Sequence, residues 1–106
     1  MNDILDSLRD VISQRKNNPT EGSYTCYLFE QGLDKILKKC GEETAEVIIA
    51  AKNAEKSALT GEISDLIYHV LVLMAQTDIS LDELYSELAR RREKIGNLKP
   101  ARPTAD

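Results

Sequence analysis

Apolar residues recur every three or four positions along most of this chain, which is the period of an amphipathic α-helix. The spacing predicts helices over Asp3 to Lys16, Leu33 to about Asn53, Lys56 to Thr77, and Leu81 to about Ile95. Residues 19–32 are expected to form a loop that passes into a short helical stretch. The sequence contains no alternating strand pattern, hairpin dipeptide or internal repeat. We therefore expect an all-α fold of four to five helices.

The chain has 106 residues, enough for one small domain. We expect that domain to span residues 1–98, followed by a flexible C-terminal tail at 99–106 that contains two prolines. The helix over 56–77 is the most apolar and is predicted to be central. A chain of this size buries only about 65% of its unfolded surface. A second copy is therefore expected to complete the bundle as a homodimer.

Charge and targeting signals narrow the possible partners. Fourteen basic and eighteen acidic residues give a formal charge of −4, which opposes general binding to nucleic acid or anionic membranes. The longest uncharged run, Leu66 to Thr77, is too short to cross a bilayer, and the N-terminus lacks a secretory pattern, so we expect a cytoplasmic protein. Cys26 and Cys40 are predicted to be reduced thiols, since they form neither a disulfide framework nor a zinc motif.

Acidic side chains border the apolar stripes of the two longest predicted helices. On a helical projection of 33–53, the predicted core face occupies an arc of about 120° and comprises Ile36, Leu37, Cys40, Thr44, Val47, Ile48 and Ala51. Beside this arc lie Glu42, Glu43 and Glu46, and the next helix carries Glu62 and Asp65 in the same relation to its own stripe. The short connection at 53–55 predicts antiparallel packing, which would bring the five carboxylates together.

Five carboxylates in one space require cations. Oxygen ligands without thiolates favour Mg²⁺, which in turn favours phosphate chemistry. A di-iron centre is the weaker choice, because it needs two Glu-x-x-His pairs and the single histidine follows Leu66 at that spacing. The alternative is a solvated acidic face without a metal. Gly41, directly before Glu42, indicates either a close approach by backbone or ligand, or a kink in the helix.

Three segments carry a family resemblance: Gly22-Ser23-Tyr24-Thr25, the run Lys39-Cys40-Gly41-Glu42-Glu43-Thr44-Ala45-Glu46, and the run Glu62-Ile63-Ser64-Asp65-Leu66-Ile67-Tyr68-His69. From about Ser7 to Arg92 the chain resembles the phosphoribosyl-ATP pyrophosphatases, within the MazG-like all-α nucleotide pyrophosphohydrolases. The resemblance implies a MazG-like helical bundle completed by dimerisation. It also implies Mg²⁺-dependent hydrolysis of phosphoribosyl-ATP to phosphoribosyl-AMP and pyrophosphate, the second step of histidine biosynthesis.

Residue roles follow from the same resemblance. It implies that the metal ligands are Glu43, Glu46, Glu62 and Asp65. Glu42 would be a further ligand or the catalytic group that orients and deprotonates water. The spacing singles out no side chain for reading the adenine base.

Four further polar residues have two interpretations each. Ser23 and Thr25 would hydrogen-bond phosphate or ribose, against ordinary capping roles, and Lys39 would contact a phosphate or pair with Glu43. His69 would orient the Asp65 carboxylate or serve as a structural core residue.

Two other functions fit the same sequence. The first is a MazG-like or dimeric dUTPase-like house-cleaning hydrolase that acts on noncanonical nucleotides through the same carboxylates. The second is a noncatalytic helical dimerisation module whose acidic edges bind a basic partner. A preference for another nucleoside triphosphate would favour the first, and the absence of magnesium-dependent activity would favour the second.

Overall fold

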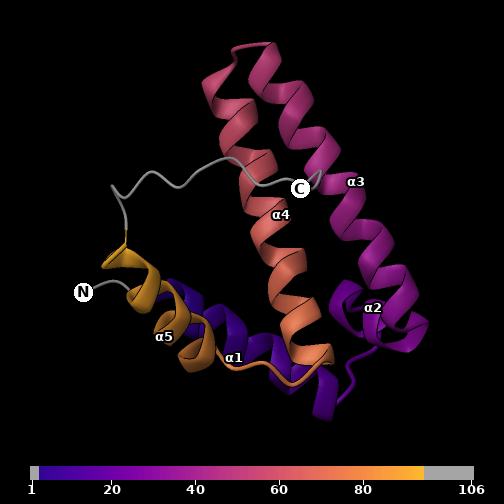
Figure 1. The fold of residues 1–106 in the computed structure, drawn as a ribbon. Coiled ribbons are helices and arrows are strands. Elements are labelled where there is room, and N and C mark those ends of the chain that lie inside the picture. The colour runs from indigo at the N-terminus through magenta and orange to yellow at the C-terminus, as the bar shows by residue number, and fades with distance from the viewer. Residues whose placement is uncertain (1–2, 95–106) are drawn as a thin grey trace.

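The computed structural model describes residues 3–94, which form five α-helices and no strand within that range (Figure 1). In chain order these are α1 (Ile4–Asn17), α2 (Tyr24–Gln31), α3 (Leu33–Lys52), α4 (Lys56–Gln76) and α5 (Leu81–Arg92). The predicted all-α fold is confirmed. The sequence placed the last helix end near Ile95, whereas α5 ends at Arg92 with Glu93 as its C-cap. The predicted tail at 99–106 lies outside the described residues.

Local signals set several helix boundaries. α1 ends at Asn17, just before Pro19, whose ring cannot donate a backbone hydrogen bond. α5 begins with a capping box, in which the Glu83 backbone N–H donates to Ser80 Oγ at 3.0 Å and the Ser80 N–H donates to Glu83 Oε2 at 2.8 Å. The spacing of Ser80 and Glu83 in the sequence already has the form of this motif.

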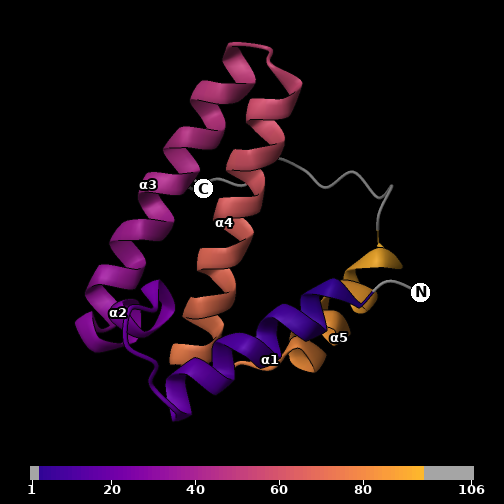
Figure 2. The ribbon, with the colours of Figure 1, turned by 180° about the vertical axis from the view of Figure 1, so that it is seen from behind.

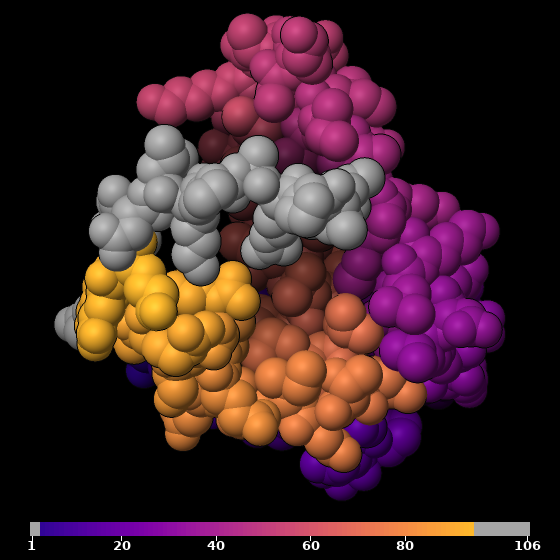
Figure 3. Space-filling view, in the orientation of Figure 1, coloured from indigo at the N-terminus to yellow at the C-terminus, as the bar shows by residue number. Residues whose placement is uncertain are grey.

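The longest helices, α3 and α4, form an antiparallel hairpin. Residues 53–55 connect them, and Ala54 adopts a left-handed φ of 59° in this tight turn. Two opposite views show the pair side by side, with α1 and α5 crossing the end of the hairpin away from the turn (Figures 1 and 2). α4 packs against α1, α2 and α3 and is the central helix, as predicted. In the space-filling view the tip of the hairpin projects beyond the other helices (Figure 3).

The hydrophobic core lies at the base of the hairpin. Its four fully buried large side chains come from four different helices: Ile12, Leu28, Ile36 and Val72. The C-terminal half of α4 adds Leu71, Met74 and Ala75 to the same cluster. The base of the hairpin is thus the part of the chain that α1 and α2 cover.

Part of the predicted core face of α3 is exposed rather than buried. Ile36 is buried, but Leu37 and Ile48 are 46% and 59% exposed, and Ala51 is also exposed. For Ile48 and Ala51, which lie near the turn, the reason is geometric, since α1, α2 and α5 gather at the other end and leave only α4 against this half of α3 (Figures 1 and 2). Leu37 lies near the start of α3, next to the buried Ile36, and is exposed there. Ile63 and Ile67 of α4 are 40% and 41% exposed on the facing helix.

Within residues 3–94, α4 is also long and apolar enough to cross a membrane by length and composition alone. Only 28% of its most apolar stretch is buried within the single chain. The core helix of a soluble protein passes the same test, and α4 carries Glu62 and Asp65 and packs on three other helices. The finding is weak evidence for a span.

Candidate active site

Three carboxylates from α3 and α4 converge at one place. One carboxylate oxygen from each of Glu43, Glu62 and Asp65 lies within 4.8 Å of the others, the one such group of potential metal ligands among residues 3–94. Glu62 and Asp65 share a side of α4 because they are three residues apart. The antiparallel packing of α3 then brings Glu43 to them. Glu43 and Glu62 are partly buried, whereas Asp65 is exposed.

The electrostatics of this acidic cluster are dominated by like charges around Glu62. Burial raises the pKa of Glu62, and the negative charges of Glu46, Asp65 and Glu43 raise it further. Glu46 therefore lies close enough to act on Glu62, although it is outside the group that meets within 4.8 Å. A cation among these groups would relieve their mutual repulsion.

The donor set fits a hard divalent cation. The ligands brought together are three carboxylates, with neither thiolate nor imidazole among them, which suits Mg²⁺. His69 is unsuited to bind iron here, because its Nδ1 lies 2.8 Å from the backbone oxygen of Asp65 and its Nε2 lies 3.0 Å from the hydroxyl of Tyr24. Both ring nitrogens of the histidine are thus already engaged.

Lys39 borders the acidic cluster on α3. Its Nζ lies 3.2 Å from a Glu42 carboxylate oxygen and 3.8 Å from one of Glu43, so the pairing with Glu43 considered from sequence is present. The hydrogen bond to Glu42 raises the pKa of Lys39 and keeps the ammonium charged. The Glu42 side chain is 48% exposed and points to the outer edge of the cluster rather than into the group of three.

Ser23 and Thr25 have structural partners. Ser23 is the N-cap of α2, and its Oγ accepts a hydrogen bond from the Cys26 backbone N–H at 3.2 Å. The Thr25 hydroxyl hydrogen-bonds the Tyr68 hydroxyl across to α4. Ser23 thus has the capping role considered from sequence, whereas the Thr25 contact joins α2 to α4 and is not a cap.

His69 is buried, at 5% exposed, and connects α2 to the acidic cluster. The Asp65 backbone oxygen can only accept, so Nδ1 carries the hydrogen and Nε2 accepts from the Tyr24 hydroxyl. The histidine thus hydrogen-bonds the backbone oxygen of Asp65. One sequence-based interpretation had it orient the Asp65 carboxylate instead, and the other made it a structural core residue, which fits its burial. Tyr24 was missed as a functional candidate, and the only available signal was its place in the Gly22 to Thr25 segment.

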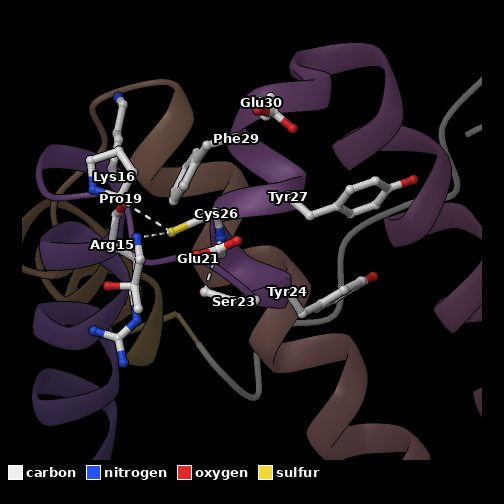
Figure 4. A pocket seen from close by; sticks show the side chains of 12 residues that line it. Arg15, Lys16, Pro19, Glu21, Ser23, Tyr24, Cys26, Tyr27, Phe29 and Glu30 are labelled. Atoms are coloured by element: carbon white, nitrogen blue, oxygen red, sulfur yellow. Dashed lines mark hydrogen bonds between the residues drawn. The ribbon is translucent and has the colours of Figure 1, made fainter.

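A cavity of about 860 Å³ opens where α1 meets the start of α2 (Figure 4). Arg15, Cys26 and Ser23 line one side, and the rings of Tyr24 and Tyr27 project together from the other side of α2. Hydrogen bonding from the Thr20 backbone lowers the pKa of the Cys26 thiol. The sulfur also lies 3.4 Å from the Arg15 backbone oxygen, which is consistent with a structural thiol.

Gly41 lies inside α3, which runs without interruption from Leu33 to Lys52. A Cβ added there would meet nothing within 4 Å among the described residues. The close approach that would explain this glycine is therefore not made by the packing of residues 3–94.

An all-helical chain in which carboxylates from two antiparallel helices converge has the features of the MazG-like all-α nucleotide pyrophosphohydrolases. Residues 5–92 match the family described as phosphoribosyl-ATP pyrophosphohydrolase. The chain belongs to this family. The resemblance stated from sequence and the prediction that the chain is a hydrolytic enzyme are thereby confirmed.

Similar proteins cover nearly the whole chain. A phosphoribosyl-ATP pyrophosphatase of Clostridium botulinum (strain Hall) is 56% identical over 105 residues, which is 99% of this chain and 96% of that protein. One of Clostridium acetobutylicum is 58% identical and covers 95% of this chain and 92% of its own length. A histidine biosynthesis bifunctional protein of Thermoanaerobacter pseudethanolicus is 62% identical over 79% of this chain, which corresponds to 39% of that longer protein.

Proposed function

We propose that this chain hydrolyses phosphoribosyl-ATP to phosphoribosyl-AMP and pyrophosphate with Mg²⁺ held by the acidic cluster, as the second step of histidine biosynthesis. The observation that carries the proposal is the convergence of Glu43, Glu62 and Asp65 within 4.8 Å in a member of this family. The raised pKa of Glu62 supports it, because the cluster holds repelling charges that a divalent cation would offset.

In this proposal each residue in or beside the acidic cluster has its own role in the reaction. Glu43, Glu62 and Asp65 hold the metal, with Glu46 beside them as a further ligand. Bound Mg²⁺ supplies positive charge that offsets the charge on the phosphates as pyrophosphate leaves. Glu42 joins the ligands or accepts the proton of the attacking water, since it neighbours the cluster and stays half exposed. The Lys39 ammonium contacts a substrate phosphate from the rim.

A homodimer and a cytoplasmic location belong to the same proposal. The hairpin of α3 and α4 exposes Leu37, Ile48, Ile63 and Ile67, which a second copy would cover. The negative formal charge of −4 gives the chain no general attraction to anionic membranes or nucleic acid.

A substrate panel tests the proposed reaction. Phosphoribosyl-ATP, dUTP, ATP and other nucleoside triphosphates would be compared at matched concentrations, with pyrophosphate release as the readout. We expect the highest kcat/KM for phosphoribosyl-ATP. A preference for dUTP or another triphosphate would indicate a house-cleaning hydrolase, and no release from any substrate would indicate the noncatalytic module.

A further inference from the structure

Two tyrosines stand exposed on one side of α2. Tyr24 and Tyr27 are 45% and 42% exposed, and their ring centroids lie 6.0 Å apart with an interplanar angle of 26°. Tyr68 of α4 extends the row, with its ring centroid 6.2 Å from that of Tyr24 at 29°. Figure 4 shows the Tyr24 and Tyr27 side chains projecting side by side, away from Arg15 and Cys26. The three rings form an aromatic row with its outer member open to solvent.

Charged groups edge this aromatic row. The Lys35 Nζ lies 5.9 Å from the centre of the Tyr27 ring, and Lys39 follows four residues later on the same side of α3. The Lys39 charge also acts on Tyr24, since it lowers the pKa of that phenol against the larger effect of burial, which raises it. The aromatic row thus has one ammonium group over its outer ring and a second that acts on Tyr24.

The row is fixed next to the acidic cluster. The Tyr24 hydroxyl donates to Nε2 of His69, and the same imidazole holds the backbone oxygen of Asp65, a member of the cluster. The His69 ring packs edge-on against both Tyr24 and Tyr68, with centroid distances of 5.8 Å and 4.9 Å. A ligand whose phosphates bind at the acidic cluster would therefore lie next to the aromatic row.

We propose that the purine ring of the substrate stacks on the open end of this aromatic row, at Tyr27 with Tyr24 next to it, and that the row selects a nucleotide with a large planar base. This inference rests on the proposed function, since it assigns the base-binding part of the same site. Phosphates are anionic and belong at the metal and the lysines, and a ribose has no flat face to stack. A purine is planar and largely uncharged, and stacking on aromatic rings is its common mode of binding.

Binding of AMP without Mg²⁺ tests the inference separately from hydrolysis. The chain has four tyrosines and no tryptophan, so tyrosine labelled only at its ring Cε atoms gives four NMR signals, one from each residue. Tyr85 is the internal control, because it lies on α5, is 38% exposed and makes no ring contact with another residue in 3–94. Ribose 5-phosphate serves as the matched ligand that lacks a base.

The inference expects AMP to shift the Tyr24 and Tyr27 signals while the Tyr85 signal stays in place. Ribose 5-phosphate should leave all of these signals in place. Tyr27→Leu should weaken AMP binding by roughly ten- to a hundredfold, whereas Tyr27→Phe and Tyr85→Leu should bind as the wild type does. In turnover assays Tyr27→Leu should raise KM for phosphoribosyl-ATP with little change in kcat. Circular dichroism would confirm that each variant is folded.

Several results would overturn it. The first is that AMP causes no shift at Tyr24 and Tyr27. The second is that Tyr27→Leu binds AMP as tightly as the wild type does. The third is that the ring signals change on dilution without AMP, because a second copy would then cover the rings. If AMP binds as expected but phosphoribosyl-ATP is not hydrolysed, the proposed function fails and the base site stands. If hydrolysis proceeds and the rings do not respond, the base site fails alone.

Discussion

The Tyr24 hydroxyl oxygen lies 3.0 Å from Nε2 of His69, a contact that joins α2 to α4 beside the acidic cluster. Tyr24→Phe leaves the buried Nε2 without its donor, so we expect a loss of about 1 kcal/mol in the free energy of unfolding. Urea denaturation measures this loss. Tyr85→Phe is the matched control, as the Tyr85 hydroxyl has no hydrogen-bond partner among residues 3–94, and should change little. Equal losses in the two variants would contradict this role of His69.

Glu62 makes the stability of the metal-free protein depend on pH. Its folded pKa is raised above the ordinary value of 4.5. The stability it contributes is therefore fully present below about pH 4.5 and is lost as the pH rises through the raised pKa. In the presence of a chelator, Glu62→Gln should melt at a higher temperature than the wild type at about pH 7.5, and the two should converge near pH 4.

Thermal melts across this pH range provide the measurement. Glu30→Gln, which changes an exposed acid on α2 outside the acidic cluster, should leave the melting temperature nearly unchanged. If the difference in melting temperature between Glu62→Gln and the wild type increased as the pH fell, it would contradict the claim that the Glu62 charge destabilises the metal-free protein.

Two helix-interior glycines allow a matched test of what approaches α3. A Cβ at Gly41 or at Gly61 would meet nothing within 4 Å. Each substitution by alanine should therefore stabilise the chain by up to about 1 kcal/mol, because glycine is the poorer helix former. Chemical denaturation measures both. If Gly41→Ala destabilises while Gly61→Ala stabilises, another molecule, such as a second copy, lies against Gly41.

We predict that two copies of the chain associate through the exposed apolar side of the α3–α4 hairpin. Ile48 is 59% exposed on α3, and Ile48→Glu would place a charge in the expected contact between copies. Sedimentation should show a dimer for the wild type and a monomer for this variant. Leu88→Glu, which alters a 53% exposed residue on α5, should remain dimeric. A wild-type monomer at micromolar concentration would contradict the prediction.

The helices were predictable because their signals are local. The apolar period, the capping box at Ser80 and Glu83, and the short connection at 53–55 each act within a few residues. The meeting of α3 and α4 carboxylates followed from that connection. Which of the five acids meet was not predictable, because it depends on how the two helices pack, and Glu46 falls outside the group of three.

Long-range contacts account for what sequence reasoning missed. Tyr24 and His69 are separated by 45 residues, and no periodicity within a helix reports on such a pair. The same limit applies to Ile48, which belongs to the apolar arc of α3 but is exposed, because α4 is the one helix described beside this half of α3 and it leaves Ile48 uncovered. Helical periodicity identifies an apolar face without saying what covers it.

The dependence of pyrophosphate release on Mg²⁺ tests the central claim most directly. Wild type and Asp65→Asn would be assayed with phosphoribosyl-ATP across a magnesium titration, with Glu30→Gln as the control variant. We expect release that requires magnesium, a loss of at least about a hundredfold in kcat/KM for Asp65→Asn, and wild-type behaviour in the control. Undiminished release in the presence of a chelator, or an Asp65→Asn variant as active as the wild type, would contradict a magnesium site built by the acids of α3 and α4.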